Sequence, residues 1–190
     1  MSEPYNSWPF ARAAVAAFPP LCQVLAEEAA EGLAPFVDAG YRKSSLIAVV
    51  LGKPVHIPQR IHFVGRVHVA SEVLSEPWFA ANCLQARSTD GYARHASLRH
   101  LLYANRPWTV PFVVLLAGEY VVEIIEDMVS SLSTFDRQLY VDFVRENRGL
   151  MLQLHARATS YWDCYYRAEF PDKRAYPGLV FLHQLELWGN

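Results

Sequence analysis

Residues 108–128 read WTVPFVVLLAGEYVVEIIEDM, and this stretch does more than any other to set the expected fold. Its first eleven residues carry no formal charge, and acidic residues then follow at helical spacing. We predict one buried central helix over 108–131. Four acids, defined here as the acidic stripe, then lie along one side of it: Glu119, Glu123, Glu126 and Asp127.

The acidic stripe needs partners, because an ionised carboxylate among apolar side chains is costly unless it is paired or hydrogen-bonded. One interpretation is a buried ion pair that fixes how helices cross. The other is a carboxylate cluster that performs acid–base chemistry or binds a metal. A di-metal bundle would need Glu-x-x-His motifs on facing helices, which the sequence lacks, so no metal is predicted. The candidate partners are four basic residues elsewhere in the chain: Arg94, Arg99, His155 and Arg157.

A second long helix is predicted over 149–168. Apolar residues recur at gaps of four and seven, which is the spacing of one helical ridge, and a bend is expected at 147–149. Few charged residues interrupt this helix, so we expect it to be covered on most sides and to pack against 108–131. The ridge consists of Leu139, Phe143, Leu150, Leu154, Tyr161 and Tyr165.

Two shorter helices are predicted nearer the N-terminus. The first covers 20–32 and has an apolar face that includes Leu21, Val24 and Ala29. The second is a short apolar helix over 46–51, capped by a serine at 44 or 45.

The segment 55–69 has two interpretations, because its apolar and polar residues alternate as in a half-buried strand while several of them also fit a helical face. We favour an extended piece at 54–58 followed by a helix. The residues at 88–91 have N-cap chemistry for a helix through Leu102. The tail at 179–188 is predicted to be a short strand or a docked extended segment.

The segment 90–96, DGYARHA, resembles the second helix of a HEAT-type repeat. The likeness covers about a dozen residues and has no clear periodic partner. Because most of the predicted elements are helices, we predict a mostly α fold with one compact multi-helix domain over 1–190. An irregular helical-repeat-like arrangement stays open, and at most a minor β element is expected near 55–69 or 179–187.

An aromatic segment at 160–167, SYWDCYYR, is a second candidate site. On a helix, Tyr161 and Tyr165 share one face, and Trp162 and Tyr166 share the next. Either these rings form an aromatic core with satisfied hydroxyl groups, or they form a recognition surface together with Arg167. The second interpretation rests on the prominence of Trp, Tyr and Arg in protein interfaces.

A third set consists of basic residues at even positions of the ambiguous segment. On a strand they would share one face and could bind an anion or a metal, whereas on a helix they scatter. We favour a solvated basic edge. The set is His56, Arg60, His62, Arg66 and His68.

Composition and motifs exclude several classes of protein. A net charge of −2 provides no basic field for nucleic acid. The longest apolar segment, 110–125, is too short for a membrane span and contains two acids. The sequence has no phosphate-binding Gly-rich loop, no Gly-x-Ser-x-Gly and no His-Glu-x-x-His. We therefore predict no cofactor, no nucleic-acid partner and no membrane partner.

The expected location is cytoplasmic, because the first residues lack the pattern of a secretory signal. The three cysteines, Cys22, Cys83 and Cys164, are widely separated and odd in number, so we expect free thiols rather than a disulfide framework.

The sequence does not determine a function. The class we favour is a non-catalytic helical binding or scaffolding module that acts through a protein partner or self-association, because the chain is rich in aromatic residues and lacks catalytic motifs. The alternative is a helical enzyme or small-ligand-binding protein with a pocket lined by Glu119, Glu123, Arg94 and Arg157. The candidate binding residues of the first class are Tyr161, Trp162, Tyr166 and Arg167, and the ligand of the second class is unknown.

Overall fold

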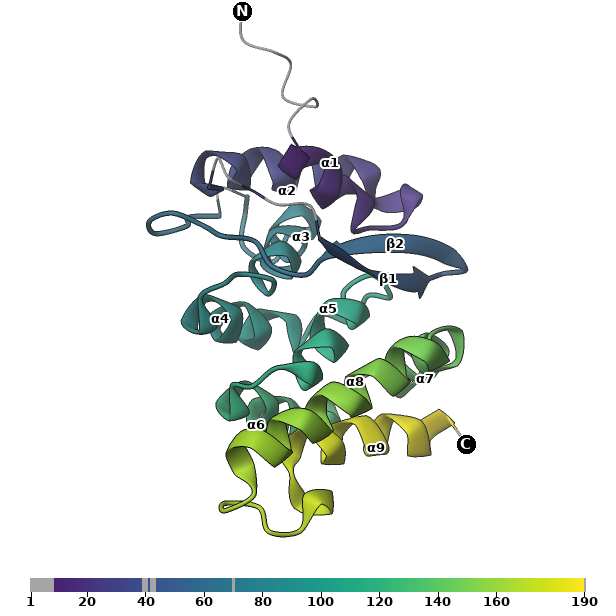
Figure 1. Cartoon of the computed structure of the whole chain (residues 1–190). Coiled ribbons are helices and arrows are strands. Elements are labelled where there is room, and N and C mark those ends of the chain that lie inside the picture. Colours follow the sequence, from purple (N-terminus) through teal and green to yellow (C-terminus); the bar gives the residue numbers. More distant parts are fainter. Residues whose placement is uncertain (1–8, 39–40, 42–43, 70, 190) are drawn as a thin grey trace, which may run out of the picture. The chain divides into compact units, whose positions relative to one another are not determined.

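The computed structural model describes residues 9–38, 41, 44–69 and 71–189. The chain divides into two compact units (Figure 1), which we call the N-terminal unit, 1–101, and the C-terminal unit, 102–190. Helices dominate both, and the one sheet among the described residues is a two-stranded hairpin. The predicted mostly α fold is confirmed. The single domain over 1–190 stays a prediction.

The first described elements of the N-terminal unit are α1 (Pro9–Ala16), which was not predicted from the sequence, and α2 (Gln23–Leu33). The predicted helix over 20–32 is confirmed, but its predicted apolar face is wrong, because Leu21 and Val24 are 71% and 78% exposed. The buried face of α2 is mainly alanine. Small side chains let α1 and α3 (Glu76–Gln85) pack directly against it.

The hairpin consists of β1 (Ser45–Val50) and β2 (Lys53–Pro58), so the helix predicted over 46–51 is wrong. Leu51 and Gly52 have φ angles of 54° and 71°, as in the two-residue turns that match the twist of paired strands. The extended piece predicted at 54–58 is confirmed, with Val55 and Ile57 buried and His56 exposed.

The helix predicted after residue 58 is wrong, because the chain stays extended and finds hydrogen-bond partners in other segments. Ile61 N–H donates to the Arg87 carbonyl at 2.8 Å, and Thr89 N–H donates to the Ile61 carbonyl at 2.9 Å. Val64 N–H donates to the Phe36 carbonyl at 2.7 Å. These bonds hold 61–64 between the chain at 36–38 and the connection that follows α3.

The helices α3 and α4 (Gly91–Leu101) pack against each other and are both capped. The Ser75 hydroxyl accepts from Trp78 N–H at 3.3 Å, and the Asp90 carboxylate accepts from Tyr92 N–H at 3.0 Å. The helix predicted after 88–91 is therefore confirmed. Buried Arg87 joins the end of α3 to the end of β2, since its guanidinium donates to the Pro58 and Gln59 carbonyls.

In the C-terminal unit, the single helix predicted over 108–131 is wrong. The segment forms α5 (Val110–Val114), a 3₁₀ turn η4 (Leu115–Gly118) and α6 (Val122–Ser130). Glu119 interrupts the helix with extended angles, φ −102° and ψ 167°. The break follows Gly118, a poor helix former, where a Cβ atom would lie 2.8 Å from Leu154 Cδ2.

The helix predicted over 149–168 corresponds to α8 (Arg148–Tyr161), which continues into a π turn, η6 (Trp162–Tyr166). The bend expected at 147–149 is confirmed as a break at Asn147 between α7 (Arg137–Glu146) and α8. Coverage on most sides is wrong, because only four residues of α8 are buried.

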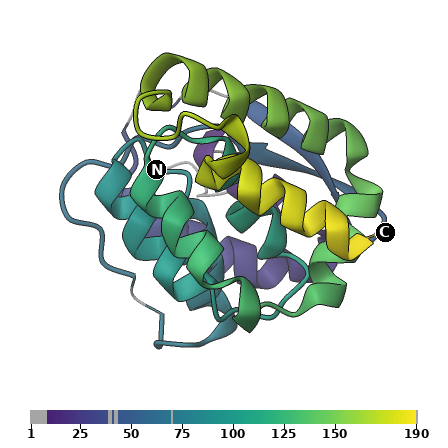
Figure 2. The ribbon, with the colours of Figure 1, turned by 90° about the horizontal axis from the view of Figure 1, so that it is seen from below.

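The centre of the C-terminal unit is α9 (Pro177–Gly189), so the strand or extended tail predicted at 179–188 is wrong. This helix contacts α6, α7, α8 and η4, and it runs beside α8 (Figure 2). Because neighbours cover it from several directions, its apolar residues do not form one stripe with a helical period. Among the described residues, no helix combines the length and apolar character needed to cross a bilayer.

Candidate functional site

The acidic stripe does not exist as one surface. Glu119 is fully buried in the helix break, whereas Glu123 and Glu126 are exposed on α6 and Asp127 is half-buried there. The predicted alignment failed because it required 119–127 to be one continuous helix.

The predicted partners of the stripe take different places. The Arg94 guanidinium is buried and donates to the Ser88 and Thr89 carbonyls at 2.9 and 3.1 Å. Arg99 is exposed on α4. His155 Nε2 lies 2.9 Å from Glu186 Oε1.

Arg157 is the predicted partner that lies beside the helix break within the C-terminal unit. Its Nε atom is 3.6 Å from where a Cβ atom on Gly118 would stand, so the stem of this side chain runs over the backbone that precedes Glu119.

The aromatic segment 160–167 has an inner and an outer side. On the inner side, Trp162 Nε1 donates to the Phe170 carbonyl at 2.8 Å, and the Tyr166 hydroxyl donates to the Tyr120 carbonyl at 2.5 Å. Tyr166 also stacks on buried Tyr176, with ring centroids 5.4 Å apart. The Arg167 guanidinium lies over the Trp162 ring and pairs with Asp163.

The outer side presents three neighbouring tyrosines, defined here as the tyrosine surface: Tyr120, Tyr161 and Tyr165. The ring centroids of Tyr120 and Tyr161 are 6.0 Å apart, and those of Tyr161 and Tyr165 are 6.3 Å apart. Tyr120 is 49% exposed and Tyr165 is 69% exposed. Trp162 and Tyr166, two of the predicted recognition residues, instead hold the loop that follows α8.

The even-numbered basic set is divided between different environments. His56 is exposed on β2, and His62 Nδ1 lies 2.9 Å from the Thr89 hydroxyl. Arg66 and His68, in contrast, line a cavity of about 470 Å³. A single basic edge would require one continuous strand, and the strand ends at Pro58.

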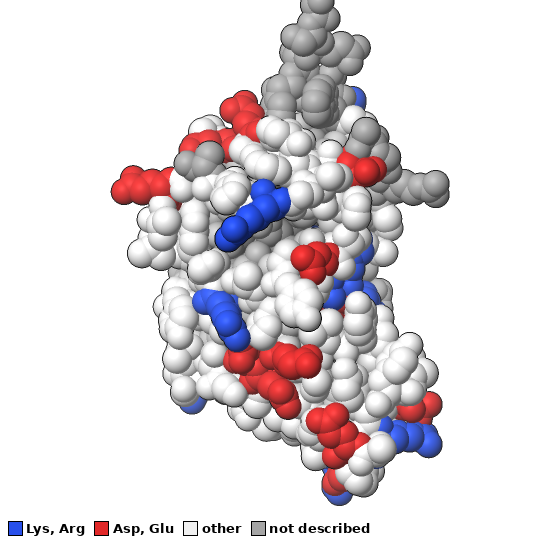
Figure 3. Space-filling model, turned by 90° about the vertical axis from the view of Figure 1, so that its left-hand side faces the viewer, with Lys and Arg blue, Asp and Glu red and all other residues white. Residues whose placement is uncertain are grey.

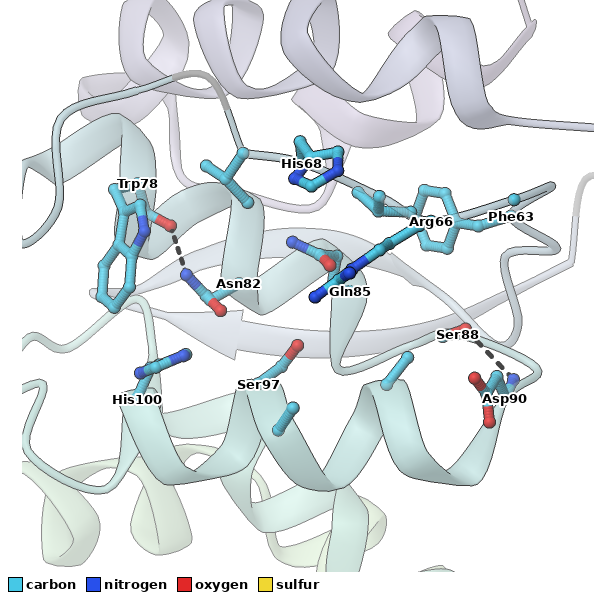
Figure 4. A pocket seen from close by; sticks show the side chains of 15 residues that line it. Phe63, Arg66, His68, Trp78, Asn82, Gln85, Ser88, Asp90, Ser97 and His100 are labelled. Carbon is cyan, nitrogen blue, oxygen red and sulfur yellow. Dashed lines mark hydrogen bonds between the residues drawn. The ribbon is translucent and has the colours of Figure 1, made fainter.

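We call this cavity the polar cleft (Figure 4). Its walls are the extended segment 63–69, α3 and α4. Phe63, Val67 and Val69 contribute apolar surface from the loop, and Trp78 contributes it from α3. The polar side chains that face the space are Arg66, His68, Asn82, Gln85, Ser97 and His100.

Two polar side chains of the cleft are almost completely buried. Asn82 is 4% exposed and Ser97 is 3% exposed. Asn82 Nδ2 donates to the Trp78 carbonyl at 2.9 Å, which leaves Oδ1 directed toward the space that the Ser97 hydroxyl also faces (Figure 4). Within the described part of the chain, no side-chain hydrogen bond engages the Ser97 hydroxyl.

At one end of the cleft, the His100 ring packs against the Trp78 ring with centroids 4.6 Å apart. Burial lowers the pKa of His100 from its ordinary value of 6.5. The imidazole is therefore mainly neutral at pH 7, with one nitrogen that donates and one that accepts.

The formal charges of the cleft are one arginine and one aspartate. Among the described residues, no ion pair joins Arg66 to Asp90. Asp90 lies at the end of the cleft away from Trp78, where it caps α4 (Figure 4). Figure 3 shows a face on which basic side chains stand singly, with a hollow beside one of them.

Four residues of the cleft were not predicted from the sequence: Trp78, Asn82, Ser97 and His100. Asn82 stands inside the apolar run WFAANCL, and Ser97 is a small polar residue on the face of α4 that turns toward α3. A polar residue on an otherwise buried helix face was the signal that could have found them.

Over 9–38, 41, 44–69 and 71–189, groups of His, Cys, Asp and Glu that could hold a metal ion are not present. Comparisons with protein-family models, curated protein sequences and solved structures find no match to this chain.

Proposed function

We propose that this protein binds a small polar molecule in the polar cleft. The observation that carries the proposal is the pair Asn82 and Ser97, two almost fully buried residues whose polar atoms are accessible only from a cavity of ligand size. Cavities of roughly 300 to 1,000 Å³ are typical of small-molecule sites. The proposal takes up the small-ligand alternative left open by the sequence, rather than the favoured scaffolding class, and moves its site away from Glu119.

We propose binding as the role of the cleft, because its one carboxylate already serves the fold: Asp90 accepts from Tyr92 N–H as the cap of α4. The His68 and His100 imidazoles line the cleft and are the groups of the type that a general base needs.

The test is a ligand-observed NMR screen of polar metabolites against the full chain and a cleft-blocked variant. Ala96 is exposed and lines the cleft, so Ala96→Trp should fill the space without disturbing the core. The matched control is Ala156→Trp, the same change on the exposed side of α8. We expect hits that bind the native chain and the control but not Ala96→Trp. Hits that bind all three equally, or no hits, would refute the proposal.

A second proposed function is association with another protein or with a second copy of this chain. The exposed tyrosine surface favours it, because tyrosine provides a large apolar area with a polar tip at interfaces. Tyr120→Ser with Tyr165→Ser removes the exposed rings and leaves the Tyr120 carbonyl that accepts from Tyr166.

Sedimentation velocity tests self-association, with Tyr103→Ser as the control at an exposed tyrosine outside this surface. We expect a concentration-dependent dimer that the double variant loses and the control keeps. If the chain is monomeric at every concentration, self-association is excluded. The partner in this second function would then have to be a different protein.

A further inference from the structure

We infer that the ligand of the polar cleft is a phosphate ester that also carries hydroxyl groups, with the size and chemistry of a sugar phosphate. The inference rests on the proposed function and names the class of molecule that the same site would take. It follows from how charge, donors and acceptors are distributed along the cleft.

Arg66 provides the positive charge for an anion. Its guanidinium extends from the loop at 63–69 into the cleft beside Gln85 (Figure 4). Arginine stays protonated at all relevant pH values and presents a planar set of N–H groups that fits phosphate oxygens in pairs. An anion near this group would gain a charge-assisted hydrogen bond.

Two other side chains that can donate N–H line the same cavity. The Gln85 amide comes from α3 and the His68 imidazole from the loop (Figure 4). A phosphate monoester carries a charge of roughly −1.5 to −2 at pH 7 and three acceptor oxygens. Donors that come from two different segments suit a tetrahedral group with several oxygens better than a planar carboxylate with two.

The part of the cleft near Trp78 has a different character. Asn82 Oδ1 is an acceptor, the Ser97 hydroxyl both donates and accepts, and the neutral His100 imidazole does both through separate nitrogens. An anion would leave Asn82 Oδ1 without a donor. Hydroxyl groups satisfy all three residues, because each O–H both donates and accepts.

In this arrangement the phosphate lies near Arg66 and the hydroxyl groups lie near Trp78. The negative charge of Asp90 does not oppose it strongly. The carboxylate accepts from Tyr92 N–H at the N-terminus of α4, where the partial positive charge of the helix end offsets part of it. A cavity of about 470 Å³ is also large enough for a sugar phosphate.

The test measures the dissociation constants of ribose 5-phosphate, ribose, inorganic phosphate and citrate by titration of the full chain, followed by two-dimensional NMR. We expect ribose 5-phosphate to bind more tightly than the other three. Arg66→Gln should weaken ribose 5-phosphate by about tenfold to a hundredfold, as expected for a charge-assisted hydrogen bond, and leave ribose unchanged. Ser97→Ala should weaken both ribose and ribose 5-phosphate.

The controls match the changes in charge and in hydroxyl groups. Lys53→Gln removes one positive charge in the hairpin, and Ser160→Ala removes one exposed hydroxyl from α8. Equal binding of ribose and ribose 5-phosphate, tighter binding of citrate, or equal effects of Arg66→Gln and Lys53→Gln would overturn the inference. Those outcomes leave the proposed function intact if ligands still distinguish Ala96→Trp from Ala156→Trp. Loss of that distinction refutes the function itself.

Discussion

At the scale of single residues, two stacked tyrosines of the C-terminal unit differ in their hydrogen bonds. The Tyr166 hydroxyl donates to the Tyr120 carbonyl. The Tyr176 hydroxyl is buried, and it has no hydrogen-bond partner among the described residues. A buried hydroxyl without a partner is unfavourable, whereas a paired one contributes modestly to stability.

We therefore expect opposite effects from the same chemical change. Tyr176→Phe removes an unpaired hydroxyl and should leave the free energy of unfolding unchanged or raise it by about 1 kcal/mol. Tyr166→Phe removes a paired hydroxyl and should lower that free energy by about 0.5–1.5 kcal/mol. Urea denaturation of both variants measures the difference. A Tyr176→Phe variant that loses more stability than Tyr166→Phe would contradict this assignment.

Residue roles in the candidate site were predictable only where a local pattern revealed them. Arg66 and His68 were found because they alternate with apolar residues. Their cleft was not found, because it forms only when the loop at 63–69 lies across α3 and α4. Ser97 and Asn82 come from two different helices, so no spacing along the chain relates them.

At the scale of elements, small residues set how closely the parts of the C-terminal unit approach. A Cβ atom on Gly178 would lie 2.9 Å from Tyr176 Cε1, 3.1 Å from the Ala117 carbonyl oxygen and 3.4 Å from Ala158 Cβ. The start of α9 thus packs against η4 and α8 at a point where no side chain fits.

Alanine at this position should be destabilising, although alanine usually favours a helix. We expect Gly178→Ala to lower the free energy of unfolding by about 1–3 kcal/mol through overpacking. The matched control is Gly149→Ala on the exposed start of α8, where a Cβ atom would meet nothing within 4 Å. That control should raise stability by about 0.5–1 kcal/mol. Thermal unfolding of the two variants decides the matter, and a shift of the same sign in both would count against close packing at Gly178.

An element could be predicted from the sequence where its signals are local, and it was missed where they are long-range. The start of α4 was predictable because Asp90 and its cap are local. The break at Glu119 was not, because apolar residues continue on both sides and the close contact between Gly118 and Leu154 is long-range. The α9 helix was not predictable from periodicity, because it is apolar around most of its circumference. The hairpin was missed because leucine at a positive φ gives no turn signal of the Asn-Gly kind.

At the scale of the whole molecule, both units contain groups whose pKa is raised by folding. Burial, and to a lesser degree the charge of Glu76, raises the pKa of the Cys22 thiol from 9.0 to about 11. Burial also raises the pKa of Tyr140 and Tyr176 above the ordinary value for tyrosine. The unfolded chain therefore loses these protons at lower pH than the folded chain.

The stability that the Cys22 thiol contributes is fully present below pH 9 and should be lost as the pH rises from about 9 to 11, whereas the contribution of the two tyrosines begins to fall only above pH 10.0. We expect the free energy of unfolding, measured with urea, to fall over this range. Cys22→Ala should reduce the slope by at most about 1.4 kcal/mol per pH unit, the value for one proton. A constant free energy up to pH 11, or an unchanged slope in the variant, would show that the buried thiol is not responsible.

The contrast between the three cysteines has a practical consequence. Cys22 and Cys83 are buried, whereas Cys164 is exposed in the π turn beside Tyr165. A maleimide dye or a nitroxide should therefore couple to the native chain at a single position without any mutation. A fluorophore at that position would report the approach of another molecule to the neighbouring rings, and a paramagnetic probe there would broaden the resonances of nuclei around it.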